Sequence, residues 1–492
     1  MAELTLSEMA QVYGGTLMYP DCRFQSVSTD SRHIDEGQLF VALRGERFDA
    51  HEFLPEVATR AGGMVVERPV KDINVPQWVV PNTTEALGQI ALSNRKAFRG
   101  PVVAITGSSG KTTVKEMVST ILGESAPAFL SESAPAALGE SAPVLATKGN
   151  LNNHIGVPLT LLALSSQHRF AVIEMGASAL GEISYLCDLA CPDVVLVNNV
   201  LPAHVEGFGS VENIARAKGE IYQGVSAEGT AVVNLDEPYV DQWLASTRAR
   251  VLTFSMVNSE ADFTARDLVV DERGCCTFVL VTPVGEASIK LPLAGQHNVA
   301  NALAAAACSH AAGAELGLIS SGLNKLQQVS GRLNIERLDN GSTIIDDTYN
   351  ANPGSVKAAI DALVNIRGRH VLILGDMGEL GDDEAAMHGD VGRYAAEQGV
   401  DTLLAVGPLC ANTVREFGAK GKHFDSKEQL VEYLLASETA NETNSEADSE
   451  TVGEIKSLLK KDAVVLVKGS RFMGMEQVVK VLVQLIKESG EK

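Results

Sequence analysis

Residues 102–117 read VVAITGSSGKTTVKEM, and this stretch decides the fold of the middle of the chain. The apolar run at its start predicts a buried strand, and the Gly/Ser turn after it leads into a predicted helix. A helix N-terminus behind a glycine-rich turn binds phosphate, because backbone N–H groups and the positive end of the helix dipole face the anion. The stretch therefore predicts a nucleotide-binding α/β domain, with a plain strand-to-helix turn as the alternative.

The turn in this stretch has an unusual spacing. Phosphate loops commonly carry Gly, four residues and then Gly-Lys-Ser/Thr. Here Ile105 stands five residues before Gly110, and the leading glycine, Gly107, comes two residues late. A lysine suits the β- and γ-phosphates, and a threonine hydroxyl can ligate Mg²⁺. The residues of this loop that we expect to bind a nucleotide are Gly107, Ser108, Ser109, Gly110, Lys111, Thr112 and Thr113.

Length and composition restrict the class of protein. With 492 residues the chain is too long for one hydrophobic core, so several domains are expected. A net charge of −22 argues against nonspecific binding to nucleic acid or to anionic membranes. Seven scattered cysteines without a CxxC pair indicate reduced thiols rather than a disulfide framework. The sequence has no signal peptide and no apolar run of about 18 residues, so we expect a cytoplasmic protein with no membrane segment.

Short apolar strands recur along the chain, each stopped by polar residues or glycine. They predict two largely parallel sheets with flanking helices, separated by an antiparallel piece over residues 260–293. We therefore expect an α/β fold of three domains. These are a smaller N-terminal α/β domain (1–98), a central domain with a P-loop-type, mostly parallel sheet (99–327) and a Rossmann-like C-terminal domain (328–492).

Two segments have a biased composition. Glu-Ser-Ala-Pro occurs three times near residues 123–143, and the acidic tract SETANETNSEADSETVGE fills residues 437–454. Three short copies are too few for a solenoid. We expect a surface insertion at the first segment and a solvated loop at the second, and for both a plain linker is favoured over a binding motif.

Three polar residues of the central domain are candidates for chemistry. Glu174 ends the apolar strand of FAVIEMGAS, and His204 follows that of VVLVNNVLPAH. Ligand-facing groups of α/β sheets lie at the carboxyl ends of strands, so these two side chains could share a metal near the phosphates. Lys218 follows on the predicted helix NIARAKGEIY. Taken singly, each residue is explained at least as well by a structural role or a solvated charge.

Two further stretches combine asparagine or aspartate with a predicted strand or helix end. Asn298 and Asn301 stand at the start of the helix in AGQHNVANALAAAA. An amide side chain can meet the edge of a purine, and helix capping is the alternative. In the third domain, the strand of IIDDTYNANPGS ends in Asp346-Asp347 and continues into a turn, so its asparagines could be structural.

The combination of motifs resembles the Mur ligases, the ATP-dependent amide-forming enzymes of peptidoglycan precursor synthesis. TGSSGKTT is similar to that family's variant phosphate loop, and the resemblance spans essentially the whole chain. It rests on TGSSGKTTVKEM, KGNLNNHIGVPLTLL, EMGAS, AHVEGFGS, ARAKGEIY, DDTYNANPGS, LGDMGELG, VKGSR and the N-terminal STDSRHIDEGQLFVALRGERFDAHEF. These motifs are most similar to the branch that adds D-alanyl-D-alanine to a UDP-N-acetylmuramoyl tripeptide.

The resemblance implies ATP and Mg²⁺ as cofactors and assigns roles to residues. Lys111, Glu174, His204 and Lys218 would form the catalytic set, and Lys218 matches a lysine that is carbamylated in several relatives. The implied nucleotide contacts are Lys111, Thr112, Asn298, Arg332 and Asp347, and the implied metal sites are Thr113, Glu174, His204 and Lys218. The implied substrate contacts are Ser31 and Arg32 at the uridine end, Asn152 and Asn153 at the sugar-phosphate part, and Ser470 and Arg471 at D-alanyl-D-alanine.

The implied reaction passes through an acyl phosphate of the tripeptide, which the amine of D-alanyl-D-alanine attacks, and the expected protein is a monomer. The nearest alternative is the ligase that adds the third amino acid, but the Asp-Asn-Pro-Arg signature of its diaminopimelate-adding form is absent. Folylpolyglutamate synthase shares the core, but the N-terminal motif argues for a UDP-sugar substrate. A non-catalytic nucleotide-binding protein would leave Glu174, His204, Lys218 and Asp347 without a joint purpose.

Overall fold

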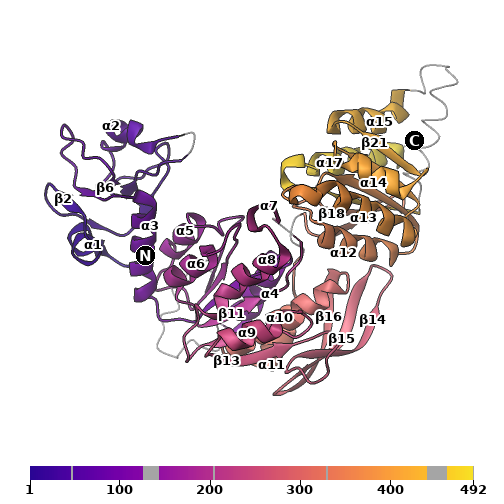
Figure 1. Ribbon diagram of the computed structural model, residues 1–492, viewed down its shortest axis with the longest axis horizontal. Helices are drawn as coiled ribbons and strands as arrows, with labels where there is room; N and C mark the ends of the chain where they lie inside the picture. The colour runs from indigo at the N-terminus through magenta and orange to yellow at the C-terminus, as the bar shows by residue number, and fades with distance from the viewer. Residues whose placement is uncertain (46–47, 126–142, 203–204, 328–330, 440–461, 491–492) are drawn as a thin grey trace.

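The computed structural model describes residues 1–45, 48–125, 143–202, 205–327, 331–439 and 462–490. Figure 1 shows an arc in which the N-terminal and C-terminal parts form the two ends and the central part lies between them. The expected α/β fold of three domains is confirmed. Among the described residues, no helix combines the length and the apolar character that crossing a bilayer requires.

The N-terminal part contains β1 (Leu4–Thr5), α1 (Leu6–Tyr13), β2 (Thr16–Met18), β3 (Arg23–Phe24), β4 (Val27–Ser28), β5 (Leu39–Val41), η1 (Ala50–Phe53), α2 (Leu54–Val57), β6 (Gly63–Val66), β7 (Gln77–Val79) and α3 (Thr83–Ala97). Its five-stranded sheet has the order β2-β7-β6-β5-β4, and β1 pairs with β3 in a separate ribbon. Helix α1 begins with a capping box between Thr5 and Glu8. Helix α3 packs onto the central part, where Asn94 donates to the carbonyl oxygen of Leu161 at 2.8 Å.

The first central segment contains β8 (Val102–Thr106), α4 (Lys111–Ser125), β9 (Val144–Ala146), α5 (Gly156–Leu162), β10 (Phe170–Glu174), α6 (Glu182–Ala190), β11 (Val194–Val197), α7 (Val205–Phe208), α8 (Val211–Gly219), η3 (Glu220–Tyr222), β12 (Thr230–Asn234), α9 (Val240–Ser246) and β13 (Arg250–Phe254). The strands form a six-stranded sheet in the order β13-β12-β11-β8-β10-β9, with every pairing parallel. Residues of β8 alternate between two cores: Val102 and Ala104 face the side of α3, and Val103 and Ile105 face α4. Because both faces are covered, the strand is an unbroken apolar run.

The second central segment contains β14 (Thr264–Val270), β15 (Cys275–Thr282), β16 (Gly285–Ala294), α10 (His297–Ala311) and α11 (Leu316–Asn324). The three strands form an antiparallel sheet, which confirms the expectation for residues 260–293. Helix α10 is rich in alanine and buried along most of its length, so it can pack closely against α4 and the parallel sheet.

The C-terminal part contains β17 (Asn334–Arg337), β18 (Thr343–Asp347), α12 (Pro353–Val364), β19 (Arg369–Gly375), η4 (Gly381–Asp383), α13 (Glu384–Glu397), β20 (Thr402–Val406), α14 (Cys410–Phe417), β21 (Gly421–Phe424), α15 (Lys427–Thr439), β22 (Ala463–Lys468), η5 (Arg471–Met473) and α17 (Glu476–Gly490). Its sheet has the order β17-β18-β22-β19-β20-β21, and all pairings except β17 with β18 are parallel. Helices α12 to α14 cover one face, and α15 and α17 cover the other.

The structure corrects the expected start of both compositionally biased segments. Helix α4 continues to Ser125 and α15 continues to Thr439, so each segment begins inside a helix and not in a loop. The rest of the Glu-Ser-Ala-Pro insertion (126–142) and of the acidic tract (440–454) lies outside the described residues, as does His204. The domain limits at residues 98/99 and 327/328 remain a prediction.

Candidate functional site

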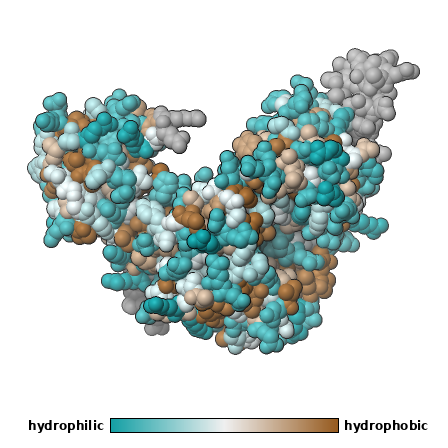
Figure 2. All heavy atoms as spheres, in the orientation of Figure 1, coloured by the Kyte–Doolittle hydropathy of each residue, from teal (hydrophilic) through white to brown (hydrophobic). Residues whose placement is uncertain are grey.

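A cleft of about 1210 Å³ lies between the central and C-terminal sheets. Its walls are the loops that follow β8, β10, β11 and β12 on one side and β18, β19 and β22 on the other. Carboxyl ends of parallel strands meet at one edge of a sheet, so two such edges face each other here. Figure 2 shows that the concave side of the arc is hollowed above the central part, between the N-terminal and C-terminal ends.

The phosphate loop lies at the centre of this cleft and has no room for a side chain at its second glycine. Gly110 adopts φ +77°, and a Cβ atom there would lie 2.6 Å from both Asn198 Nδ2 and Asn301 Oδ1. Asn198 donates to the carbonyl oxygen of Ser109 at 2.9 Å, and Asn199 Oδ1 accepts the N–H of Ser109 at 2.8 Å. The loop is therefore fixed by two asparagines that follow β11, one of which donates to Asn301 of α10, and this leaves the remaining N–H groups of the loop for a ligand.

Two cations converge on the loop. The Lys111 ammonium donates to the carbonyl oxygen of Gly107 at 2.8 Å. Burial lowers the pKa of Lys111, the nearby Glu174 opposes this effect, and Arg332 adds to it. Arg332 donates to Thr112 Oγ1 at 2.9 Å across the cleft, while its Nε is buried and has no hydrogen-bond partner. Two crowded cations with unused donors fit a polyanion such as the phosphate chain of ATP.

Glu174 ends β10 and is 3% exposed. Its carboxylate accepts from the Thr112 hydroxyl at 2.8 Å and from Asn152 Nδ2 at 2.8 Å. Thr113 lines the same cleft. A carboxylate and two hydroxyls are hard oxygen donors of the kind that Mg²⁺ takes beside phosphate, so these residues fit that ion. Asn153 has a structural role, since its side chain accepts the N–H of Gly156 at the start of α5.

Lys218 lies on α8 and is 2% exposed. Burial, with a smaller contribution from Lys111, lowers its pKa well below 10.5. Within the described chain its ammonium forms no ion pair, and the nearest ring, that of Phe208, lies 5.9 Å away. The solvated charge considered from the sequence is therefore wrong for this residue.

Asn298 and Asn301 are buried in the first two turns of α10. Asn298 donates to the carbonyl oxygen of Ala294 at 2.7 Å, and Asn301 donates to Asn298 Oδ1 at 3.0 Å. Neither side chain accepts a helix N–H in these bonds, so capping does not explain them. They connect α10 to the phosphate loop through Asn198, which donates to Asn301 at 2.9 Å.

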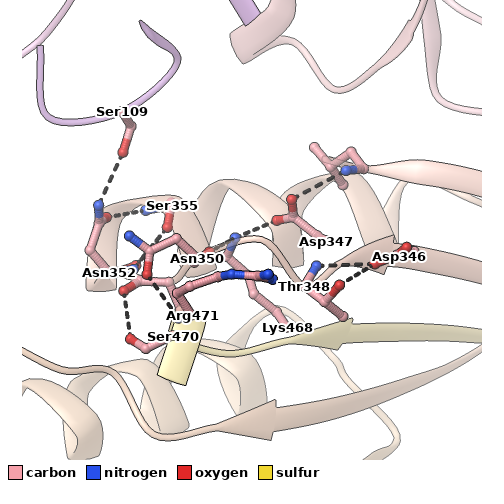
Figure 3. A network of polar contacts seen from close by, with 12 residues as sticks. Ser109, Asp346, Asp347, Thr348, Asn350, Asn352, Ser355, Lys468, Ser470 and Arg471 are labelled. Atoms are coloured by element: carbon pink, nitrogen blue, oxygen red, sulfur yellow. Dashed lines mark hydrogen bonds and ion pairs between the residues drawn. The ribbon is translucent and has the colours of Figure 1, made fainter. Parts of the chain in front are cut away.

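The C-terminal wall contains a buried ion pair, shown in Figure 3. Asp347 on β18 is the register partner of Lys468 on β22, and the two side chains form a salt bridge. Lys468 also donates to the carbonyl oxygen of Asn350 at 2.9 Å. Asn352 caps α12 and donates to Ser109 Oγ at 3.1 Å, a contact between the two walls. The turn asparagines are thus structural and also face the phosphate loop.

The two residues expected at D-alanyl-D-alanine have different surroundings. Ser470 is buried, and its hydroxyl accepts the N–H of Gly378 at 2.8 Å and donates to the carbonyl oxygen of Ala351 at 3.2 Å. Arg471 lines the cleft, with its side chain 66% exposed and its guanidinium 5.9 Å from the Tyr349 ring. Arg471 pairs with Glu476 at 3.5 Å but lines the cleft, whereas Ser470 holds two loops together.

Ser31 and Arg32 lie on the N-terminal part and do not line the cleft. Arg32 is exposed and pairs with Asp30 at 2.9 Å. The hydrogen bonds from Arg32 lower the pKa of the Asp30 carboxyl. The structure therefore does not bring these two residues together with the phosphate loop, whereas Asn152 and Asn153 do line the cleft.

Several cleft residues are missing from the sequence-based assignment. Asn198 and Lys468 each lie at the carboxyl end of an apolar strand, the same signal that selected Glu174 and Asp347. Applying that rule to every strand would have found them. Other polar cleft residues outside the sequence-based assignment include Asn199, Asp236, His297, Tyr349, Asn350, Asn352 and Glu379.

Two protein families of known function match the parts of the chain that form the cleft. The Mur ligase middle domain matches residues 105–309, and the Mur ligase glutamate ligase domain matches residues 331–471. The chain belongs to the Mur ligase family. This Mur ligase is 41% identical to the UDP-N-acetylmuramoyl-tripeptide--D-alanyl-D-alanine ligase of Escherichia coli K12, over 98% of its own length and 99% of the relative's.

Solved structures agree with the sequence comparison. MurF from Acinetobacter baumannii superposes on this Mur ligase with a TM-score of 0.85 at 35% identity, covering 98% of this chain and 99% of that one. MurF from Thermotoga maritima in complex with ADP gives a TM-score of 0.77 at 27% identity, covering 94% and 98%. The shared architecture therefore extends over all three parts of the molecule.

Proposed function

We propose that this Mur ligase uses ATP to join D-alanyl-D-alanine to the UDP-N-acetylmuramoyl tripeptide, giving the pentapeptide, ADP and phosphate. The observation that carries the proposal is 41% identity over nearly the full length of both chains to a relative that bears the name of this activity. The cleft supports the proposal, because Arg332 of the C-terminal wall donates a hydrogen bond to Thr112 in the phosphate loop of the central wall.

The chemistry requires ATP because a carboxylate reacts poorly with an amine. Transfer of the γ-phosphoryl group to the tripeptide carboxylate gives an acyl phosphate, which expels phosphate when the amine of D-alanyl-D-alanine attacks. Such transfers depend on positioning and on charge stabilisation. Lys111 and Arg332 supply positive charge at the loop, and Asn298 and Asp347 are proposed to contact the nucleotide from the two walls.

We assign Glu174, Thr112 and Thr113 as residues that would hold Mg²⁺, with His204 and Lys218 as further members of the metal sites. When bound, Mg²⁺ would neutralise charge on the transferring group. Lys218 has its pKa lowered well below 10.5 by burial. The neutral amine that this favours is the form that can react with carbon dioxide, which supports carbamylation as the modification of this residue.

The remaining assignments follow the same division of the molecule. Ser31 and Arg32 would bind the uridine end, Asn152 and Asn153 the sugar-phosphate part, and Ser470 and Arg471 the added dipeptide. Because ATP contacts come from both walls, closure of the C-terminal domain over the nucleotide would complete the site. We place the enzyme in the cytoplasm, since all seven cysteines are free thiols. We propose further that it acts as a monomer.

The test is phosphate release from ATP and Mg²⁺ with the UDP-muramoyl tripeptide and D-alanyl-D-alanine, added singly and together. Release that requires both, with a pentapeptide product by mass, is the expected result. Release with the UDP-muramoyl dipeptide and a free amino acid would assign the chain to the ligase of the third amino acid. Nucleotide binding without release in either case would indicate a non-catalytic binding protein.

A further inference from the structure

The motif LGDMGELG, residues 374–381, has no role in the function proposed above. It forms the loop after β19, and within it Met377 and Leu380 are buried while Glu379 is exposed between them. Glu379 lines the cleft between the two walls. The loop therefore anchors two apolar side chains and presents one carboxylate to the site.

The backbone of Glu379 is strained. Its φ is +62°, in the left-handed region that residues with a side chain rarely adopt. Five non-glycine residues of the described chain have a positive φ, and of these Glu379 and Leu333 line the cleft. Strain of this kind persists where the surroundings enforce it, and it is concentrated at binding sites.

The surroundings of Glu379 enforce its conformation from both sides. The N–H of Met377 donates to His388 Nε2 at 3.0 Å, and the N–H of Gly378 donates to Ser470 Oγ at 2.8 Å. His388 in turn is oriented by the carbonyl oxygen of Glu384, 2.7 Å from its Nδ1. Beyond the loop, η4 packs against α7 of the central part. Glu379 is thus held on a rigid support beside the opposite wall.

A positive charge stands on the neighbouring loop. Strands β19 and β22 are parallel partners, so the loops that follow them run side by side. The N–H of Ser470 donates to the carbonyl oxygen of Asp376 at 3.1 Å, which ties the loops together. The second loop brings Arg471 into the same cleft, and the Arg471 guanidinium also pairs with Glu476 at 3.5 Å. The C-terminal wall therefore presents one carboxylate and one guanidinium on two adjoining loops.

We propose that Glu379 binds the ammonium group of the incoming D-alanyl-D-alanine, while Arg471 receives its carboxylate. A free dipeptide carries one charge of each sign at its two ends, and hydrogen bonds between charged groups are stronger than neutral ones. The contact of η4 with α7 puts the ammonium end toward the central wall, where the acyl phosphate would form. This inference rests on the proposed function and adds the residue that selects a free amine.

The experiment compares Glu379→Gln and Glu379→Gly with wild type in the ligase assay. Both variants lack the carboxylate, while glycine tolerates the left-handed backbone. We expect KM for D-alanyl-D-alanine to rise about tenfold in both, as for the loss of one hydrogen bond to a charged group. KM for ATP and for the UDP-tripeptide should stay within about twofold. Asp382→Asn, which removes an exposed acid on the same segment outside the cleft, is the matched control and should leave all three constants unchanged.

A second measurement separates recognition of the amine from a structural role. N-Acetyl-D-alanyl-D-alanine lacks the ammonium group, so wild type should bind it far more weakly than the free dipeptide, and Glu379→Gln should lose most of that preference. A wild-type KM in the Gln variant would overturn the proposal, as would equal rises in KM for all three substrates together with a lower melting temperature. If wild type itself shows no D-alanyl-D-alanine-dependent release, the proposed function fails, and this inference fails with it.

Discussion

Two buried lysines face the same cleft from opposite walls, and they differ in whether a carboxylate pairs with them. Lys468 on the C-terminal wall is 3% exposed and forms a salt bridge with Asp347. Lys218 on the central wall is 2% exposed and forms no ion pair in the described chain. Its pKa is lowered by burial and by Lys111, whose own pKa is also lowered. The charge of Lys468 is thus balanced by a partner within its own wall, whereas Lys218 needs an anion or a modification to balance it.

The largest effect should come from the central wall, at Lys111. Lys111→Met removes a cation from the phosphate loop, so we expect kcat/KM to fall about a thousandfold. The melting temperature should not fall, because the substitution also removes a half-buried ammonium that pairs with no carboxylate in the described chain. Steady-state kinetics and thermal unfolding check both statements. Lys148→Met, at an exposed position outside the cleft, is the control and should keep wild-type kinetics.

On the C-terminal wall the main effect should be on stability. Asp347→Ala leaves Lys468 as an uncompensated buried charge, which should destabilise the C-terminal domain by about 3 kcal/mol. The double variant Asp347→Ala, Lys468→Met removes both charges and should recover most of that loss. Thermal unfolding of the three proteins measures the coupling between the two residues. A double variant as unstable as the single one would show that the pair is not what stabilises this wall.

This ion pair also marks the limit of sequence-based prediction. Unbroken apolar strands predicted parallel sheets covered on both faces, and the rule that ligand groups lie at strand ends selected Glu174 and Asp347. The same rule could have selected Lys468, but not its pairing with Asp347, because Lys468 lies far along the chain and only the β18–β22 register brings the two together. Ser470 was chosen from a motif, but its hydroxyl is occupied by loop contacts that no local pattern reveals.

A smaller effect, on KM for ATP, is expected at Arg332, where the two walls meet. Arg332→Lys keeps the charge but loses the planar fork, so it cannot both donate to Thr112 and offer a second donor to phosphate. We expect KM for ATP to rise about tenfold, with the melting temperature unchanged. Arg337→Lys, at an exposed position on β17, is the control. An unchanged KM in Arg332→Lys would mean that the two walls bind the nucleotide independently.

The smallest expected effect is a change in melting temperature that depends on pH. It tests the comparison of the two lysines most directly. Between the lowered pKa of folded Lys218 and the unfolded value of 10.5, the unfolded chain binds a proton that the folded chain does not. Wild-type stability therefore rises with pH through this window. With Lys218 unmodified, Lys218→Met removes the proton linkage, so it should raise the melting temperature at pH 7 by about 2 °C, and its advantage over wild type should shrink as the pH approaches 10.5. Lys468→Met should instead lower the melting temperature at pH 7, because it leaves Asp347 buried without its partner. A gain of the same size at every pH in Lys218→Met would mean that packing, and not the charge of the lysine, separates the two walls.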